Sequence, residues 1–318
     1  MSEHTVPTAA LVAAELRRLG LAGPDQDAAL AALGVASPPA AHCALPWGGT
    51  SLPLGTRTLV MGVVNVTDDS FSGDGLGRDL GAVLAHGEAL VAAGADVLDV
   101  GGESTRPGAA VIPADEERAR VEPAIGLLAR RLGVPLSVDT RKASVAEAAL
   151  AAGAGAVNDV SGLRHDPALA GVVARAGATL ILGHWESRLP GARWSGADPV
   201  AVVRDGLRWS LERAQAAGVA PERLAVDPGL GFGKPPRVSL ALLRGIDRLW
   251  ALGRPVVIGP SRKGFIGRVL GAEAQLGWEG TAAAVALAIA GGAAMVRVHD
   301  VARLVRVVRM ADAIVSAE

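Results

Sequence analysis

Several features that mark particular classes of protein are scarce or missing in this sequence of 318 residues. Cys43 is the only cysteine, so no disulfide can form within the chain, and the cysteine usage gives no sign of secretion. The formal net charge is −1, which excludes the broad basic excess of a nucleic-acid-binding surface. The sequence also lacks an uncharged apolar run long enough to span a membrane, and its first residues lack the basic segment of a secretory signal. We therefore expect a cytoplasmic protein that binds neither nucleic acid nor membrane.

The composition supports a large hydrophobic core, because 50% of the residues are hydrophobic and only 20% are charged. From about residue 51 onwards, short β-branched runs alternate with longer Ala-, Leu- and Arg-rich segments of helical period. The expected strands cover residues 58–65, 96–102, 135–139, 155–159, 178–184, 223–227, 254–259 and 294–299. Helical segments between them include residues 79–93, 114–132, 143–152, 198–217 and 279–291. Eight βα units with no pause at the middle predict an α/β fold, a single closed (β/α)8 TIM barrel, and favour it over an open doubly wound sheet.

Residues 1–50 are predicted to form a short helical N-terminal extension that ends in a linker. Residues 7–20 and 25–33 are rich in Ala and Leu and are expected to be helices, and a stretch containing Pro and Gly follows them. We expect the barrel to occupy residues 51–318, and the extension to pack against its underside.

Each of the expected strands ends in polar residues, at the end where barrels of this kind carry their active sites. They are Asn65, Asp99 with Glu103, Asp139, Asn158 with Asp159, His184, Asp227, Ser261 to Lys263, and Arg297 with His299. Turns and helix N-termini favour Asn and Asp in any protein, so Asp159 and Asp300 are interpreted as capping residues. Asn65 and Asn158, however, are the only asparagines of the chain, and Lys263 is one of only three lysines. The placement of these rare residue types indicates a ligand site.

Asp139 and Asp227 end strands that are almost entirely apolar, where an unpaired carboxylate is costly. Each therefore needs a partner, which is either a protein cation such as Lys263 or a ligand. A flat heterocycle with adjacent N–H groups suits a carboxylate, which accepts two such hydrogen bonds in parallel. A structural ion pair explains either Asp alone equally well. The two together with Asn158 favour the ligand.

The motifs GPSRKGFIG and RVHD end the seventh and eighth expected strands, where barrels commonly bind phosphate. Arg297 and His299 alternate with Val298, so their side chains point the same way. The planar fork of a guanidinium suits phosphate oxygens, and we expect a phosphate or diphosphate here. Asn65 is a candidate ligand for Mg²⁺, which prefers oxygen ligands shared with phosphate and water. The motif PGLGFGKPP is not a Walker A loop, because Pro235 stands where that loop needs Ser or Thr.

Seven motifs in order resemble those of the dihydropteroate synthase family, over roughly residues 57–318. They are VMGVVNVTDDSFSGDG, DVLDVGGESTRPGA, SVDTRK, AVNDVSG, DPGLGFGK, SRKGFIG and RVHDV. The resemblance implies a transferase of folate biosynthesis that condenses 6-hydroxymethyl-7,8-dihydropterin diphosphate with 4-aminobenzoate, giving 7,8-dihydropteroate and diphosphate. It also implies Mg²⁺ as cofactor, small-molecule substrates, sensitivity of the family to sulfonamides, and a homodimer formed through the later helices.

The resemblance also implies roles for individual residues. The pterin would be bound by Asp139, Asn158, Asp227, Lys263 and Trp185. The 4-aminobenzoate would be bound by Phe71, Thr105, Arg106, Pro107, Phe232 and Ser261. The diphosphate would be bound by Asn65, Arg297 and His299, with Asn65 also holding the metal. Asp139, Lys263 and Arg297 would be the catalytic residues.

Two positions depart from the family pattern. Asp68 stands where the family usually has Pro, and Trp185 stands where a Met usually lines the pterin. Neither departure removes a charged role. Two alternatives stay open: a catalytically silent pterin-binding paralogue, and the pterin-binding domain of a methyltransferase. The retained polar set argues against the first, and the Ser-Arg-Lys and Arg-x-His motifs argue against the second.

Overall fold

The structure, a computed structural model, describes residues 44–67, 75–105, 109–185, 194, 196–275 and 277–317. The two helices expected at residues 7–20 and 25–33 lie outside the described residues. Within the described part of the chain, no helix has both the length and the apolar character needed to cross a membrane.

The eight expected strands are all present and form one parallel sheet. They are β3 (Leu59–Asn65), β4 (Val97–Gly101), β5 (Leu136–Asp139), β6 (Ala156–Asp159), β7 (Thr179–Gly183), β8 (Leu224–Asp227), β9 (Val257–Ile258) and β10 (Met295–Val298). Their order in the sheet is β8-β7-β6-β5-β4-β3-β10-β9. The first and last strands of this order also meet, because Val226 N donates to Pro255 O at 2.9 Å and a parallel bridge joins Val226 to Val256. The predicted (β/α)8 barrel is confirmed.

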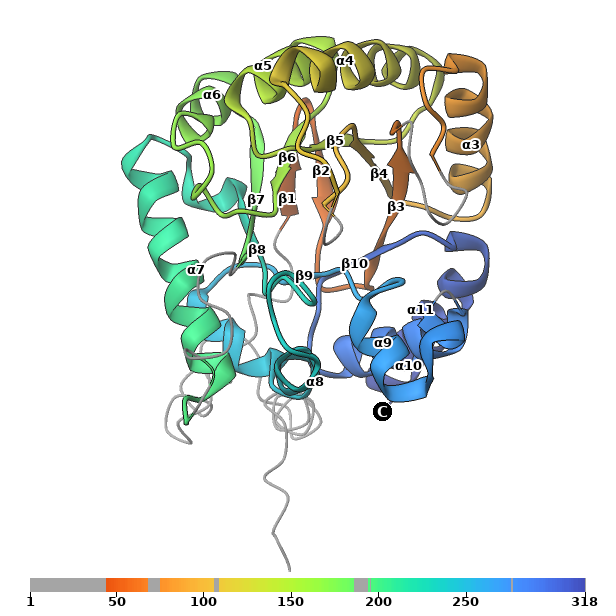
Figure 1. Ribbon diagram of the computed structural model, residues 1–318, viewed down its shortest axis with the longest axis vertical. Helices are drawn as coiled ribbons and strands as arrows, with labels where there is room; N and C mark the ends of the chain where they lie inside the picture. The colour runs from red at the N-terminus through yellow and green to blue at the C-terminus, as the bar shows by residue number, and fades with distance from the viewer. Residues whose placement is uncertain are drawn as a thin grey trace, which may run out of the picture.

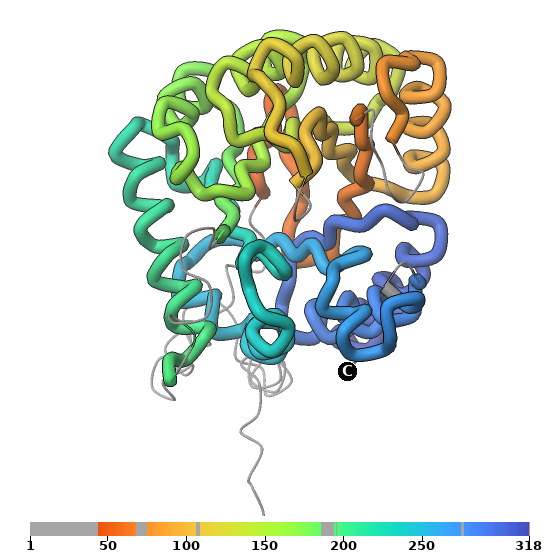
Figure 2. The backbone as a smooth tube through the Cα atoms, in the orientation of Figure 1, coloured from red at the N-terminus to blue at the C-terminus, as the bar shows by residue number. Residues whose placement is uncertain are grey.

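Helices surround the strands on the outside (Figure 1). The α-helices are α3 (Leu80–Ala92), α4 (Ala114–Arg131), α5 (Ala143–Ala152), α6 (Leu169–Ala176), α7 (Pro199–Ala216), α8 (Pro236–Arg244), α9 (Gly264–Leu270), α10 (Trp278–Ala290) and α11 (Val301–Val315). Short 3-10 helices, η2 (Pro221–Arg223), η3 (Ile246–Leu252) and η4 (Ala272–Gln275), lie in the connections. The chain makes one circuit around the barrel, which brings α11 back beside β3, the first strand of the barrel along the chain (Figure 2).

The two residues interpreted as caps do cap. Asp300 Oδ1 accepts from Arg303 N at 3.2 Å at the start of α11. Asp159 accepts from Ser161 N at 2.8 Å and from Leu163 N at 2.6 Å in the turn after β6. Such oxygens satisfy backbone donors that have no partner in a helix or strand, so neither Asp needs a ligand to explain it.

The barrel interior changes from apolar to polar along the strands. Side chains two residues apart on a strand share one face, so each strand contributes a short inward column. Its lower members, including Met61, Val97, Ala156, Ile181, Ala225 and Met295, form one buried apolar cluster. The next inward members on β4, β6, β8 and β10 are Asp99, Asn158, Asp227 and Arg297. The opposite faces of the strands, for example Val100, Val138 and Leu182, pack against the helices. The alternation therefore places the polar residues at the carboxyl end of the barrel, inside it.

A β-hairpin that the sequence did not predict closes the other end. Strands β1 (Ala44–Trp47) and β2 (Thr50–Pro53) pair antiparallel around Gly48, whose φ of +57° suits a two-residue turn. Trp47 is 2% exposed and its Nε1 donates to Leu136 O at 2.9 Å, at the start of β5. The sequence predicted a linker here because Pro46 and Pro53 argue against strands: proline is excluded from the middle of a sheet and is tolerated only at its edges. The predicted boundary after residue 50 passes through this hairpin.

Candidate active site

The polar end of the barrel is built around Arg297, on β10. Its Nε donates to Asp99 Oδ2 at 2.6 Å, and its Nη2 donates to Asp139 Oδ2 at 2.7 Å. Asp99 lies on β4 and Asp139 ends β5, so one guanidinium joins three strands. The Asp99 side chain is fully buried, whereas the Arg297 and Asp139 side chains keep 16% and 14% of their surface exposed. The two ion pairs therefore lie where the core meets the open end of the barrel.

Asp99 is the centre of this network, although it received no role from the sequence. Ser137 Oγ donates to its Oδ1 at 2.6 Å, and Asn158 Nδ2 donates to its Oδ2 at 3.0 Å. A buried carboxylate is tolerated when hydrogen bonds and a cation compensate its desolvation, and here neighbours on three strands do so. The available signal was a charged residue inside the apolar run VLDVG, since such a residue has no exposed face to occupy.

The pKa values of Asp139 and Arg297 are both raised, but for different reasons. Burial raises the pKa of Asp139 to about 7, and the nearby Asp99 adds to that rise, while Arg297 and Lys263 oppose it. The pKa of Arg297 is raised: burial acts to lower it, but Asp99 and Asp139 outweigh burial. Arg297 is therefore always a cation, and Asp139 is poised to change charge near neutral pH.

Asp227 ends β8, and none of the described cations is in direct contact with it. Its Oδ1 accepts from Gly229 N at 2.7 Å, and no described residue forms an ion pair with it. Burial raises its pKa, against the opposing effects of the Gly229 hydrogen bond and the charge of Lys263. Within the part of the chain that the structure describes, the structural ion pair considered for Asp139 and Asp227 thus exists for Asp139, with Arg297 rather than Lys263 as partner, but not for Asp227. Asp227 keeps an oxygen suited to donors on a ligand.

Lys263 lies against an aromatic wall. Its Nζ is 3.6 Å from the centroid of the Phe232 ring, within the range of a cation–π interaction. The ring of Trp185 is 5.8 Å from that of Phe232, tilted by 48°. Trp185, Phe232 and Lys263 come from the loops after β7, β8 and β9, so one side of the opening is lined by two flat rings and a cation.

The loop that carries Phe232 is held by its own lysine. Lys234 Nζ donates to the carbonyl oxygens of Gly229 at 2.8 Å and Phe232 at 3.2 Å, and also to that of His184. Gly229 has a φ of +67°, and a Cβ there would lie 2.1 Å from His184 O. Only glycine fits at such an approach. Lys234 is therefore a structural residue, consistent with the exclusion of a Walker A loop.

Ser261 and His299 are neighbours. Ser261 is buried, and its Oγ lies 2.9 Å from His299 Nδ1 and accepts from His299 N at 3.3 Å. The contact joins the loops after β9 and β10, where the sequence predicts an anion. Ser261, which the resemblance assigns to 4-aminobenzoate, thus lies beside a residue that it assigns to diphosphate.

These groups come from different strands but lie close together at the carboxyl end of the barrel. Gly259, between β9 and the Ser261 turn, shows this best. A Cβ built on it would lie 3.8 Å from Arg297 Cβ and 3.9 Å from Asp227 Oδ2. Arg297 and Asp227 therefore both lie close to Gly259, on the same side of its backbone. Asp139 and Asn158 are adjacent in register on β5 and β6.

Asn65 and Thr105 lie on the first two connections. Asn65 ends β3 and is half-buried, and no described residue hydrogen-bonds to its side chain. Thr105 is half-buried, in the connection after β4. Phe71, Arg106 and Pro107, predicted for 4-aminobenzoate, lie outside the described residues, as does Asp68.

The arrangement combines two kinds of environment. One is a carboxylate pair, Asp139 and Asp227, that suits the N–H groups of a flat ring and a positive charge on it. The other is a cation, Arg297, whose Nη1 has no acceptor among the described residues and can serve an anion. A reaction that separates a cationic ring from an anionic leaving group would use both.

The comparisons with known proteins agree with this chemistry. Residues 61–299 match the model of the family described as pterin binding enzyme. The dihydropteroate synthase of Bacillus subtilis (strain 168) is 42% identical over 260 residues, which is 82% of this chain and 90% of that protein.

Solved structures are similar over most of their length. The dihydropteroate synthase of Xanthomonas albilineans with 4-aminobenzoic acid superposes with a TM-score of 0.79 at 42% identity, over 89% of this chain and all (100%) of that one. The Burkholderia cenocepacia enzyme complexed with 7,8-dihydropteroate gives a TM-score of 0.76 at 39% identity, over 87% of this chain and 98% of that one.

Proposed function

We propose that this chain, which belongs to the pterin-binding enzyme family, condenses 6-hydroxymethyl-7,8-dihydropterin diphosphate with 4-aminobenzoate. It is an enzyme, a transferase with dihydropteroate synthase activity, and its products are 7,8-dihydropteroate and diphosphate. The observation that carries the assignment of its site is the convergence of Asp139, Asp227 and Arg297 at the carboxyl end of the barrel.

The reaction replaces a C–O bond of the pterin diphosphate with a C–N bond to 4-aminobenzoate, and releases one proton. The bond between the pterin methylene carbon and the diphosphate oxygen breaks, and its electron pair leaves with diphosphate. The amino nitrogen of 4-aminobenzoate then bonds to the cationic methylene and loses a proton. This nitrogen is already a nucleophile, so the reaction needs no activating Ser–His or Cys–His pair.

The pterin is assigned to the carboxylate side of the site. Asp227 accepts hydrogen bonds from the ring N–H groups, and Asn158 adds a polar contact beside it. Asp139 opposes the positive charge that develops on the ring, and it does so only in its ionised form. Trp185 is flat, and it provides a stacking surface in place of the family's Met. Lys263 closes this side of the pocket against Phe232.

The diphosphate is assigned to Arg297, His299 and Asn65. The Nη1 of Arg297 donates to phosphate oxygens while its other nitrogens stay bound to Asp99 and Asp139. His299 adds a donor from the next residue of the same inward column. Thr105, Phe232 and Ser261 are assigned to 4-aminobenzoate on the strength of the motif resemblance.

The residues present fit Mg²⁺ that arrives with the diphosphate. The described residues contain no cluster of three or more His, Cys, Asp or Glu side chains that could hold a metal by itself. Mg²⁺ often takes only one or two protein oxygens and completes its shell with substrate phosphates and water. Asn65 offers such an oxygen, and the bound metal would neutralise charge on the leaving group.

Turnover with both substrates tests this function. Mixing the protein with the pterin diphosphate, 4-aminobenzoate and Mg²⁺ is expected to release diphosphate in an amount equal to the dihydropteroate formed. A diphosphate-coupled assay and chromatography of the pterins measure the two products. The control omits 4-aminobenzoate. Tight binding of the pterin without any diphosphate release would instead identify a catalytically silent paralogue.

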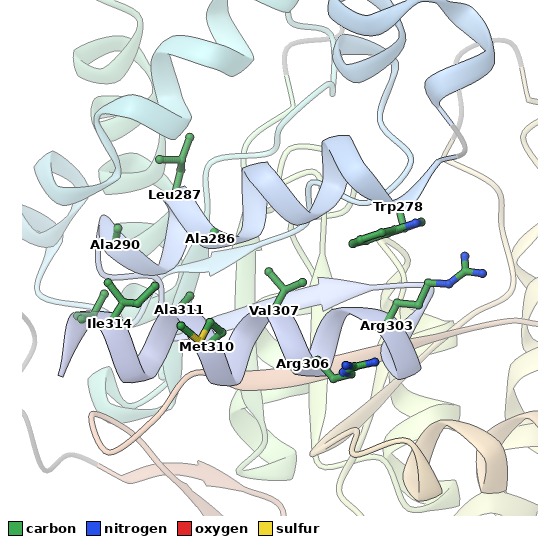
Figure 3. A pocket seen from close by; sticks show the side chains of 11 residues that line it. Trp278, Ala286, Leu287, Ala290, Arg303, Arg306, Val307, Met310, Ala311 and Ile314 are labelled. Carbon is green, nitrogen blue, oxygen red and sulfur yellow. The ribbon is translucent and has the colours of Figure 1, made fainter. Parts of the chain in front are cut away.

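A homodimer is proposed from the outer face of α10 and α11. An apolar groove of about 740 Å³ lies between these two helices. Trp278, Arg303 and Arg306 lie at one end of it, and Leu287, Ala290 and Ile314 lie at the other (Figure 3). Leu287, Met310 and Ile314 are 64%, 62% and 64% exposed. Contiguous exposed apolar surface of this kind is typical of an interface, and a second copy can cover it by two-fold pairing of the same helices.

Met310→Glu is expected to convert the dimer into a monomer, because it places a charge in the middle of the apolar groove. Light scattering after size-exclusion chromatography gives the mass directly. Val269→Glu is the matched control, since Val269 is an exposed apolar residue (58%) on α9 outside the groove. If Met310→Glu keeps the mass of the unmodified protein, α10 and α11 do not form the interface.

A further inference from the structure

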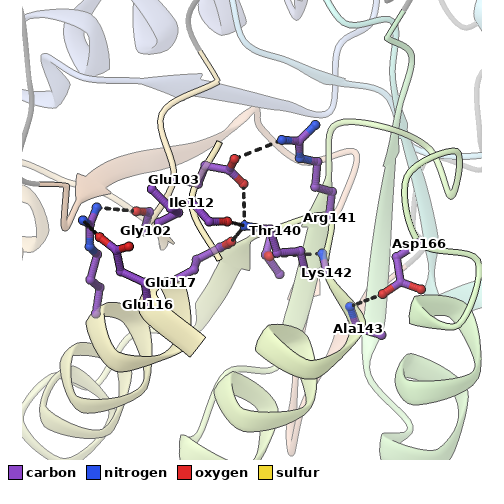
Figure 4. Close-up of polar contacts among 11 residues, drawn as sticks. Gly102, Glu103, Ile112, Glu116, Glu117, Thr140, Arg141, Lys142, Ala143 and Asp166 are labelled. Carbon is purple, nitrogen blue, oxygen red and sulfur yellow. Dashed lines mark hydrogen bonds and ion pairs between the residues drawn. The ribbon is translucent and has the colours of Figure 1, made fainter. Parts of the chain in front are cut away.

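Two consecutive cations after β5 share one carboxylate in the neighbouring connection. Arg141 Nη2 lies 2.9 Å from Glu103 Oε1, and Lys142 Nζ lies 2.9 Å from Glu103 Oε2 (Figure 4). Only 5% of the Glu103 side chain is exposed. Burial acts to raise the pKa of Glu103, but Lys142 and Arg141 together hold it below its usual value. Glu103 is therefore a buried anion with a cation on each oxygen.

Lys142 reaches both ends of the connection between β4 and α4. Its Nζ donates to Ile112 O at 2.7 Å and to Glu117 Oε2 at 2.6 Å, besides pairing with Glu103. Glu103 follows β4 by two residues, and Ile112 precedes α4 by two. An ammonium has three N–H donors, and these contacts use all three. One side chain from the next βα unit thus ties the start of the connection to its end.

The helix after the connection adds a second attachment. Arg120, on α4, donates to Gly102 O at 3.2 Å and pairs with Glu116 at 2.5 Å. Gly102 itself packs so closely that a Cβ there would lie 2.7 Å from Val121 Cγ1. The residues directly after β4 are therefore fixed from both sides, which is unusual for a surface connection.

Arg141 links the same carboxylate to the aromatic wall of the site. Its guanidinium carbon is 5.2 Å from the centroid of the Trp185 ring, and Trp185 in turn contacts Phe232. A guanidinium over an indole face is the stronger form of cation–π contact. The orientation of Arg141 is set by Glu103, because the ion pair uses one end of its planar fork.

We propose that Glu103 is a positioning residue, which Arg141 and Lys142 hold so that the segment from Gly102 to Thr105 keeps a fixed place beside the aromatic wall. This inference rests on the proposed function, in which Thr105 contacts 4-aminobenzoate. The role assigned to Glu103 is to act through Thr105, without contact to either substrate. Its effect is to set where the second substrate binds. The residues assigned to the pterin are held separately: Asp139 and Asn158 by the network around Asp99 and Arg297, and Asp227 by Gly229 N.

The experiment compares Glu103→Gln with the unmodified enzyme, with the KM for each substrate measured separately. Gln keeps the shape of Glu103 but removes the charge that holds both cations. The KM for 4-aminobenzoate is expected to rise about tenfold, the effect of one lost charge-assisted hydrogen bond. Equilibrium binding of the pterin diphosphate is expected to change less than about twofold.

Further variants separate positioning from a general loss of stability. Lys142→Arg keeps a cation near Glu103. Its KM for 4-aminobenzoate is expected to lie between those of Glu103→Gln and the unmodified enzyme. Arg57→Gln breaks the Arg57–Asp96 ion pair at the opposite end of the barrel and is expected to leave both KM values unchanged. The inference is overturned if the Glu103→Gln enzyme melts at a lower temperature but keeps its KM for 4-aminobenzoate. It is also overturned if the affinities for 4-aminobenzoate and for the pterin diphosphate fall by the same factor. If the unmodified protein does not turn over, the proposed function fails instead.

Discussion

Arg297→Met is expected to lower kcat/KM for the pterin diphosphate by about a hundredfold to a thousandfold, the loss that follows removal of one preorganised electrostatic contact. The same change is expected to lower the free energy of unfolding by about 3–5 kcal/mol. The loss of kcat/KM follows from the missing donor to the diphosphate. The loss of stability arises because Asp99 and Asp139 lose the cation that joins them, and Asp99 is fully buried. Steady-state kinetics and urea denaturation measure the two effects.

Arg297→Lys is the matched control. A lysine restores one positive charge, but its ammonium cannot present the planar fork that joins β4 and β5. We expect stability to recover partly while kcat/KM stays low. An Arg297→Met protein with nearly unchanged turnover would contradict the role assigned to the guanidinium.

Asp139→Asn is expected to remove a step from the pH profile of the enzyme. Asp139 has a pKa raised to about 7 by its burial and by Asp99. In the unmodified enzyme, kcat/KM for the pterin diphosphate is therefore expected to fall as the pH drops below about 7, because the protonated acid no longer opposes charge on the ring. The variant is expected to be about a hundredfold slower at pH 8 and to lack this step. Initial rates between about pH 5.5 and 8.5 measure it.

Asp139→Asn is expected to lower activity at pH 8 without lowering stability at that pH. The folded-state pKa of Asp139 lies above its unfolded value, so between about pH 4 and about pH 7 the folded state holds a proton that the unfolded chain has lost. The contribution of this group to stability is present at low pH and is lost as the pH rises through 7. Asn resembles the protonated acid, so Asp139→Asn should be at least as stable as the unmodified protein at pH 8. A variant that is much less stable there, or that keeps the pH step, would show that Asp139 acts as a structural ion-pair partner only.

The barrel itself was predictable because its strands are short β-branched runs separated by helical segments, and local patterns of this kind survive folding. The β1–β2 hairpin was not predicted, because Pro46 and Pro53 disguise two strands that lie at an edge where proline is tolerated. Its fit under the barrel depends on a tertiary contact, the hydrogen bond from Trp47 to Leu136 O, that no local pattern contains.

The site was predictable as a location more than as a set of partners. The ends of the strands identified Asp139, Asn158, Asp227 and Arg297, but the partner of Asp139 is Arg297, which is 158 positions away in the sequence. Closure of the barrel brings the two together, and spacing along the chain carries no trace of that contact.

The rarity of lysine in the sequence indicated where the three lysines lie in the fold, but it did not indicate what each of them does. All three lysines lie near the open end of the barrel, yet Lys234 binds backbone carbonyls of its own loop and Lys142 joins the two ends of the β4–α4 connection. Only Lys263 lies against the aromatic wall. A residue type that a chain otherwise avoids marks a constrained position, and the constraint can be structural.

A crystal structure of the protein with a bound pterin is the most direct test of where this chemistry takes place. The ring N–H groups should lie within about 3 Å of the Asp227 carboxylate, with Asn158 beside them and the ring between the aromatic wall and Arg297. A pterin that occupies any other place, with Asp227 left uncontacted, would contradict the assignment of this end of the barrel as the active site.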